Sequence, residues 1–359
     1  MEGIFFSTQM TDFHKNLHRF TLFTAACTLF LLIAGGMVTS TGSGLAVPDW
    51  PLSYGKLMPP MIGGIFYEHG HRMVATFVGF LTVILAFWFV MVEKRPWVKK
   101  LAIAALASVI LQGLLGGLTV KLLLPTEVSA AHGTLAQMFF CMVSSLAMFT
   151  SPWWLAREQA RDISEKNSLP SIKASIFLIV VIFLQLIFGA LVRHTQSALA
   201  IPDFPLAYGQ ILPSLTQESL DAYHATLIRE NVRLYADGSV TQNQILIALI
   251  HRFWALAVAV LVAWNSLKLW RSRSKDPRFG FLGGFLTGVV AAQIMLGASI
   301  VLTKRMPEIA TAHQTLGAVL LMVSVVSFLH VWRVLRGGNR LTNDVADSVS
   351  IDNKSYVTF

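Results

Sequence analysis

The sequence contains little charge and almost no cysteine, and each shortage excludes a class of protein. Charged residues make up 13% of the 359 residues, whereas hydrophobic residues make up 54%. A soluble domain carries about 25% charged residues, so a water-exposed globule of this length is excluded, as are a disordered and a collagen-like chain. The two cysteines, Cys27 and Cys141, lie inside apolar runs. Neither a disulfide framework nor a thiolate metal site is therefore expected.

The apolar residues fall into eight runs that are each long enough to cross a bilayer. A hydrocarbon core about 30 Å thick needs about 20 helical residues, and helices are expected because lipid offers no partners to open backbone groups. The sequence therefore predicts an all-α integral membrane protein with eight transmembrane helices. The predicted spans are residues 20–40, 69–92, 101–120, 130–150, 173–193, 244–267, 280–302 and 310–333.

The formal net charge of +9 is distributed unequally between the two ends of these spans. The side that holds both termini has 19 Lys and Arg residues and the opposite side has 7, with two more inside helices. The positive-inside rule places the richer side, and with it both termini, in the cytoplasm. The basic residues are thus a topology signal, and no nucleic-acid partner is expected.

The chain contains an internal duplication. The segment TGSGLAVPDWPLSYG, which begins at Thr41, matches TQSALAIPDFPLAYG, which begins at Thr195. Four spans return each half to its starting side, so the repeat predicts two tandem four-helix bundles related by pseudo-twofold symmetry about the membrane normal. The predicted parts are a cytoplasmic leader (1–19), an N-terminal half (20–150), a cytoplasmic linker (151–172), a C-terminal half (173–335) and a disordered cytoplasmic tail (336–359).

Each even-numbered span carries one histidine near its outer start: His71, His132, His251 and His313. Ionisable residues are costly in a bilayer. Four histidines at matching places in a repeat are therefore interpreted as metal ligands, and the alternative is that they are ordinary core histidines with their hydrogen bonds satisfied. Two imidazoles facing each other across a bundle suit the axial positions of one haem, whereas zinc would need a third or fourth ligand. We expect two haem sites, one in each half, near the outer leaflet.

The two halves differ beside these histidines. Glu68 lies three residues before His71, on the same helix face, but the matching position in the second half is Ala248. An acid beside one haem only predicts a reactive first half and an electron-transfer cofactor in the second; an interfacial carboxylate is the alternative. Arg72 and Arg252 each follow a histidine, so they either pair with haem propionates or anchor at headgroups.

Smaller features surround the predicted sites. The outer segments Pro48–Leu52 and Pro202–Leu206 can fold back as caps, with interfacial anchoring of Trp50 and Phe204 as the alternative. His69 is expected to face elsewhere and to lie at the interface. Small residues on the odd spans admit a neighbour or a flat ligand, with ordinary helix packing as the alternative. These are Gly35 and the glycines of three Gln-x-x-x-Gly pairs, Gln112–Gly116, Gln185–Gly189 and Gln293–Gly297.

Together these motifs resemble the haem A synthase family over about residues 20–335. The resemblance rests on the duplicated eight-span pattern, the first outer loop and the Glu68-His69-Gly70-His71-Arg72 element. It implies a membrane enzyme that oxidises the C8 methyl of haem O to the formyl group of haem A for terminal oxidase assembly. By matching positions, His71 and His132 would hold the substrate haem, and Glu68 would be the acid needed for turnover.

The resemblance also implies the cofactor, the partners and the location. His251 and His313 would bind the iron of haem B, with Arg72 and Arg252 as further cofactor-binding residues. The expected partners are haem O, the lipid bilayer, a haem O-forming farnesyltransferase, an electron acceptor and, as a homo-oligomer, a second copy of the chain. The expected location is the bacterial cytoplasmic membrane. Many family members have cysteines where this chain has Val47 and Ser53, so a disulfide in this loop is excluded.

Two other classes of protein share parts of this pattern. A bis-histidine b-type cytochrome that only exchanges electrons with quinone would need the four histidines, but a symmetric electron carrier would not need Glu68. A transporter would also show parallel repeats, but transporters usually break helices near mid-bilayer, whereas the polar residues here lie near one surface.

Overall fold

The computed structural model of the protein describes the backbone of residues 2–155, 170–232 and 239–354, and side chains within these ranges from residue 14 to residue 335. In the part described, eight helices are long and apolar enough to cross a membrane, which confirms the all-α, eight-span prediction. These are α1 (Glu2–Ser40), α2 (Gly63–Val92), α3 (Pro96–Lys121), α4 (Thr126–Thr150), α6 (Ile172–His194), α8 (Gln242–Arg271), α9 (Pro277–Leu302) and α10 (Pro307–Lys354). The protein is therefore a multi-pass membrane protein.

The spanning helices are longer than the apolar runs that predicted them, because polar turns extend each helix past the hydrocarbon. The short elements α5 (Pro152–Leu155), η2 (Ser197–Leu199) and α7 (Gln217–Arg229) lie between the spans. The tail predicted to be disordered begins at residue 336; α10 runs through residue 354 of it, and residues 355–359 lie outside the described part. Most of the predicted linker, residues 156–169, also lies outside it.

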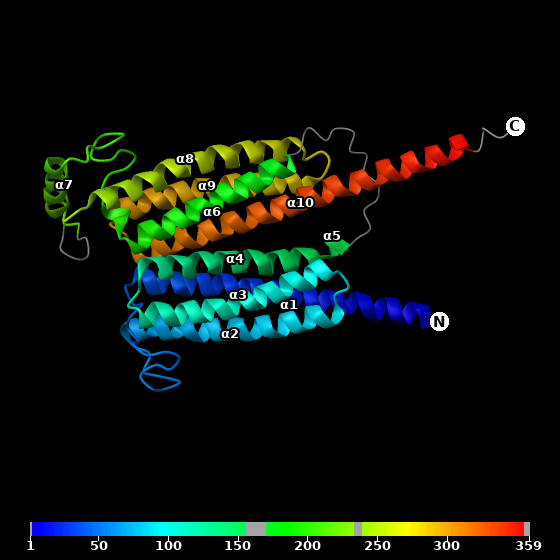
Figure 1. Ribbon diagram of the computed structural model, residues 1–359, viewed down its shortest axis with the longest axis horizontal. Coiled ribbons are helices and arrows are strands. Elements are labelled where there is room, and N and C mark those ends of the chain that lie inside the picture. The colour runs from blue at the N-terminus through cyan, green and yellow to red at the C-terminus, as the bar shows by residue number, and fades with distance from the viewer. Residues whose placement is uncertain (1, 156–169, 233–238, 355–359) are drawn as a thin grey trace.

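The eight spans form two rings of four antiparallel helices that lie side by side (Figure 1). In the first ring the contacts run α1–α2–α3–α4 and back to α1, and in the second they run α6–α8–α9–α10 and back to α6. Helices α2 and α4 therefore occupy opposite corners of one ring, and α8 and α10 occupy opposite corners of the other. These are the four helices that carry the paired histidines.

Helices α1 and α4 of the first ring face α6 and α10 of the second (Figure 1). The contacts between the rings are α1–α10, α4–α6 and α4–α10. The repeat pairs α1 with α6 and α4 with α10. When these partners are exchanged, the α1–α10 contact becomes the α6–α4 contact, and the α4–α10 contact stays the same. This pattern supports the pseudo-twofold relation that the repeat predicts.

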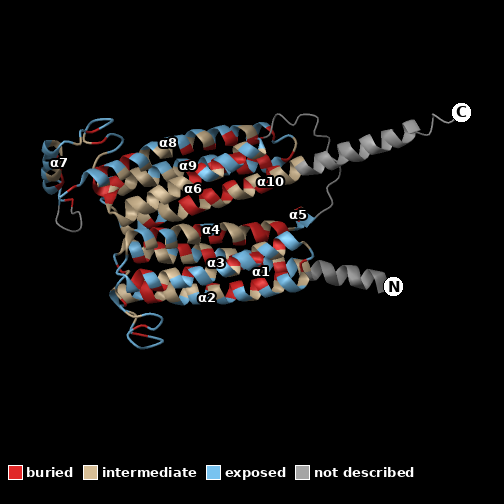
Figure 2. Ribbon diagram, in the orientation of Figure 1, coloured by how far each residue is buried: buried red, intermediate tan, exposed pale blue. Residues whose placement is uncertain are grey.

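Each ring has its own apolar core, which lies mainly toward the helix ends nearer to the two termini. In the first ring Leu85 and Phe89, one turn apart on α2, pack with Val143 and Leu146 of α4. In the second ring the core includes Ile182, Val262, Leu286 and Leu321. Many exposed residues lie along the spans (Figure 2). Large apolar side chains such as Phe80, Phe87 and Val260 are among them, as expected of a protein whose solvent is lipid.

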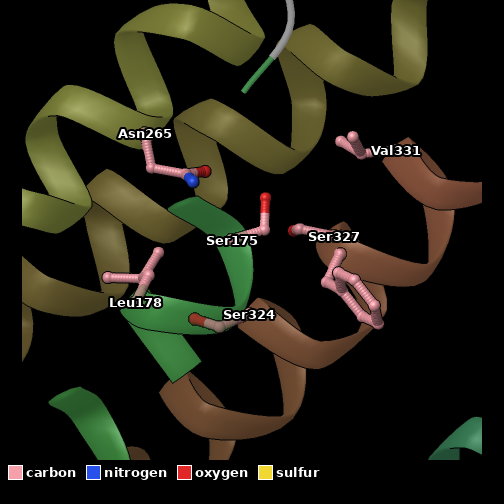
Figure 3. Close-up of a pocket in the computed structure, with 7 residues that line it drawn as sticks. Ser175, Leu178, Asn265, Ser324, Ser327 and Val331 are labelled. Atoms are coloured by element: carbon pink, nitrogen blue, oxygen red, sulfur yellow. The ribbon is translucent and has the colours of Figure 1, made fainter. Parts of the chain in front are cut away.

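Polar side chains of three helices line a gap near the end of the second ring that is closer to the two termini. Ser175 of α6, Asn265 of α8, and Ser324 and Ser327 of α10 surround a narrow gap (Figure 3). Asn265 is buried, as are the three serines. Small polar residues of this kind let helices approach closely in a membrane and bond across the contact. The cluster lies at the end of the bundle opposite to the four histidines.

Several helices begin at polar residues that cap their free N–H groups. Thr241 and Gln244 form a capping box at the start of α8. The Asp276 side chain accepts the backbone N–H of Arg278 at the start of α9 and lies 3.1 Å from Nε2 of His330 on α10. The His330 ring stacks on Trp153 of α5, with 4.1 Å between ring centroids. Asp276 thus connects the start of α9 to α10 and to the residues after α4.

The Asp276 carboxyl titrates at lower pH than an ordinary aspartate. Burial alone would raise its pKa, but the Arg278 N–H, the His330 ring and the Arg278 guanidinium together hold that pKa below its usual value. Because the folded pKa is depressed, the stabilisation is complete above the ordinary aspartate pKa of about 4. It is lost as the pH falls further, through the lowered value.

We expect Asp276→Ala to lower the free energy of unfolding by about 1–2 kcal/mol near neutral pH, because it removes a helix cap and the partner of His330. Thermal unfolding of the purified protein in detergent measures the change. Asp221→Ala, at an exposed carboxylate on α7, is the matched control and should have little effect. The difference between wild type and Asp276→Ala should shrink below about pH 4; equal losses in both variants would contradict this role.

Candidate functional site

Each of the four predicted histidines packs against a glycine of the neighbouring odd-numbered span. In the first half, a Cβ atom at Gly35 would lie 3.0 Å from the His71 ring, and one at Gly116 would lie 3.3 Å from the His132 ring. In the second half, a Cβ atom at Gly189 would lie 3.1 Å from the His251 ring, and one at Gly297 would lie 3.2 Å from the His313 ring. These distances are tighter than ordinary van der Waals contact, so even alanine would crowd the rings. The glycines therefore admit a neighbour at close range, and that neighbour is the histidine ring.

Three of the four histidines are also held through their backbone. The Nε2 atoms of Gln112, Gln185 and Gln293 donate to the backbone carbonyls of His132, His251 and His313 over 2.8, 3.1 and 2.9 Å. Each glutamine lies one helical turn before the glycine that backs the same ring. At the fourth corner, beside His71, the corresponding residue is Leu31, whose side chain has no donor to offer.

The structure brings the histidines together as the two predicted pairs. The rings of His251 and His313 have centroids 6.5 Å apart and are inclined at 74°. In the first ring of helices, His132 lies close enough to His71 for the two to interact electrostatically. The Nδ1 atoms of His132 and His313 are buried without a hydrogen-bond partner in the described residues. Both pairs lie toward the ends of their bundles that are farther from the two termini (Figure 1).

Glu68 is buried beneath the first outer loop, which corrects the alternative of an interfacial carboxylate. Its side chain is only 4% exposed. Its Oε2 accepts the backbone N–H of Val47 at 2.7 Å, and its Oε1 accepts from the Arg72 guanidinium at 2.6 Å. The corresponding Ala248 is buried in an apolar cluster. The acid that sequence comparison of the halves singled out is thus an internal group of the first half.

Arg72 and Arg252 bind the outer loops rather than projecting to the headgroups. Arg72 donates to the carbonyls of Val47, Asp49 and Leu52 over 3.1, 2.7 and 2.9 Å. Arg252 donates to the equivalent carbonyls of Ile201, Asp203 and Leu206 over 3.0, 2.9 and 2.9 Å. Each arginine therefore fixes a loop directly above the histidine that precedes it in sequence, a role that neither sequence-based alternative included.

The two outer loops share their internal bonding. Asp49 accepts the N–H groups of Tyr54 and Gly55, and Asp203 accepts those of Tyr208 and Gly209. The Gly55 and Tyr54 N–H groups hold the pKa of Asp49 below its usual value. Both tyrosines have positive φ angles of 54°, which these bonds support.

Each loop is also packed against a further element. A Cβ on Gly117 of α3 would lie 2.7 Å from the Trp50 ring, so Trp50 rests on the helix backbone. In the second half, Tyr223 of α7 stacks on Tyr208 with ring centroids 3.7 Å apart, and burial raises the pKa of the Tyr208 hydroxyl. Helix α7 therefore packs over the second loop, a contact that has no counterpart described at the first loop.

His69 was expected at the interface but is buried. It is 6% exposed, and its Nδ1 lies 2.8 Å from the Ser53 hydroxyl. The prediction was wrong because it treated the outer turn of α2 as open to headgroups, whereas the first outer loop covers that turn. The second half has Leu249 and Ala207 at the matching positions. A comparison of the two copies at every position of this turn would have found the pair.

Comparison with known proteins agrees with the geometry. The COX15-CtaA family, described as cytochrome oxidase assembly protein, matches residues 18–64 and 62–325. The heme A synthase of Alkalihalophilus pseudofirmus is 33% identical over 208 residues, which cover 56% of this chain and 68% of that protein. The heme A synthase of Geobacillus kaustophilus is 28% identical over 317 residues, which cover 83% of this chain and 96% of that protein. With both halves matched and nearly all of a relative covered, the chain belongs to the COX15-CtaA family of cytochrome oxidase assembly proteins.

Proposed function

We propose that the protein is a haem A synthase that oxidises the C8 methyl of haem O to the formyl group of haem A. The observation that carries the proposal is the pair of facing histidines in each half, with a buried acid beside the first pair only. The relatives named above are heme A synthases, which supports the same activity. His71 and His132 would hold the substrate, and His251 and His313 would hold haem B.

The spacing of the second histidine pair fits one metal ion held between two imidazoles. Imidazole nitrogens bind first-row metals at about 2 Å, so two that share one iron lie about 4 Å apart, and their ring centroids lie about 6 Å apart. The 6.5 Å between the centroids of His251 and His313 matches this requirement. The buried, unpartnered Nδ1 atoms of His132 and His313 are the polar groups that a ligand or a small rearrangement would satisfy. When bound, haem B supplies a one-electron redox centre.

Glu68 is suited to move a proton in the first half. Oxidation of a methyl group releases protons as well as electrons, and a carboxylate held near the substrate can accept them. Each Glu68 oxygen already accepts one hydrogen bond, from Val47 or Arg72, but a carboxylate oxygen has a second lone pair. Glu68 can therefore take a proton while Arg72 keeps the loop in place.

The electron-transfer alternative is less well supported. A b-type cytochrome acting with quinone would explain the four histidines, but it gives no reason for Glu68 to be present in one half only. We place both termini in the cytoplasm and the sites near the outer face of a bacterial inner membrane, on the charge distribution. The proposed partners are a haem O-forming farnesyltransferase and an electron acceptor.

The first prediction concerns Glu68→Gln, which keeps the size of the side chain but removes its base. We expect haem A to fall by about 100-fold or more, haem O to accumulate and haem B to stay. Haem extraction and chromatography of membranes measures all three. Glu127→Gln, at an exposed acid on the same side, is the control and should leave haem A normal; normal haem A in Glu68→Gln would remove the acid from the mechanism.

A second prediction separates the two sites. His251→Ala should deplete the low-spin haem B spectrum of the purified protein, because one of the two imidazoles that would hold its iron is gone. His224→Ala, on the outer helix α7, should leave that spectrum intact. A full low-spin signal in His251→Ala would show that this histidine does not bind the iron.

A third prediction tests the packing of histidine on glycine. Gly116→Val and Gly297→Val should each displace a ring and lower the amount of haem bound per chain, because even a Cβ at these positions lies within 3.3 Å of the ring. Gly113→Val and Gly288→Val are matched controls on the same two helices, since a Cβ there meets nothing within 4 Å. Equal haem contents in all four variants would contradict the arrangement.

A further inference from the structure

Arg193 lies between the two halves of the molecule, in the last turn of α6. Its guanidinium donates to the Gly36 carbonyl and the Ser40 hydroxyl of α1, each over 2.6 Å. It also donates to the Gln314 side-chain oxygen of α10. Ser40 is in turn 2.9 Å from the Thr311 hydroxyl of α10. One arginine thus connects three helices, two from the second half and one from the first.

The positive charge of Arg193 has neutral partners in this cluster. A carbonyl, a hydroxyl and an amide oxygen accept its hydrogen bonds, and no ion pair recorded in the described part of the chain includes it. The charged group that acts on it electrostatically is another cation, Arg305. An ionisable residue inside a span is costly and points to function. Within the residues that the structure describes, the recorded acceptors of this charge are therefore neutral dipoles.

The charge lies next to the second histidine pair. Gln314, which accepts from Arg193, directly follows His313, and Arg193 acts electrostatically on the His313 ring. The first half has no equivalent, because the matching positions are Thr39 and Gly133. Arg72 and Arg252 lie beside the first and the second histidine pair alike, so Arg193 is the cation at the second pair that the duplication does not repeat.

We infer that Arg193 is a positioning residue that raises the reduction potential of the haem held by His251 and His313; this rests on the proposed function. An oxidised iron centre carries one more positive charge than the reduced one. A nearby buried cation therefore disfavours the oxidised form, and in a medium of low dielectric constant the effect extends over several ångströms. With this charge, the second site becomes a better electron acceptor than the same site would be without it.

Redox titration of the purified full-length protein, followed by its low-spin absorption band, tests this role. Arg193→Gln should lower the reduced-to-oxidised ratio at a fixed ambient potential by about tenfold, which is 59 mV for a one-electron couple. Arg193→Lys keeps the charge and should stay close to wild type. Arg229→Gln, at an exposed arginine on α7, is the control and should not shift the potential.

A further variant tests the charge without removing the arginine. Gln314→Glu keeps an oxygen acceptor for Arg193 but adds a negative charge beside it, so it should lower the potential as Arg193→Gln does. Haem content and thermal midpoint, measured on every variant, show whether the bundle is intact. Because Gln314→Glu retains the link between the helices, it tests the charge even where Arg193→Gln fails to fold.

The outcomes separate this inference from the proposed function. An unchanged potential in Gln314→Glu, or equal falls in Arg193→Lys and Arg193→Gln, would overturn the role of the charge while leaving the haem sites in place. Wild-type protein that contains no low-spin haem would instead overturn the proposed function, and this inference with it. A fall in both charge variants with little change in Arg193→Lys supports the inference.

Discussion

The packing of histidine rings on glycine backbones is the contact on which the architecture depends. Each ring needs a neighbour without a side chain, and each of the four odd spans supplies one at the depth of the even span's histidine. Because α2 lies opposite α4 and α8 lies opposite α10 in their rings of helices, this repeated contact brings two imidazoles near each other in both halves. The glutamines one turn below fix three of the four backbones, so the geometry of each pair is set largely by the spans themselves.

The outer loops complete the arrangement from above, and arginine is the residue that joins loop to span. Lipid cannot satisfy loop carbonyls, and a guanidinium with several donors can bind three of them at once. Arg72 and Arg252 do this in the same way in both halves. What differs is the first half, where Glu68 accepts from Arg72 and His69 bonds Ser53. A duplicated scaffold thus carries a polar cluster in one copy and apolar residues in the other, as expected if one copy reacts and the other only exchanges electrons.

The features set by periodicity could be predicted from the sequence, and those set by contact between distant segments could not. Apolar runs gave the eight spans, and the repeat gave the histidine pairs and the unmatched Glu68. The burial of His69 depended on a loop that covers the end of α2, which no helical period reveals. Arg193 was counted among the outer charges, because nothing in α6 alone shows that Ser40 and Gln314 lie beside it. The partners of Arg72 were missed for the same reason: backbone carbonyls are not visible in a residue pattern.

Leu31 stands where the other three odd spans have a glutamine, and this difference bears on how firmly each half would hold a bound haem. His132, His251 and His313 have their helix backbones pinned by an amide, whereas His71 relies on its glycine contact and on the loop held by Arg72. A catalyst must let its product depart after each cycle, while a resident prosthetic group should never leave. On the proposed function, the half that must release its product has one of its two histidine backbones held by a glutamine, whereas the half that would keep its haem B has both.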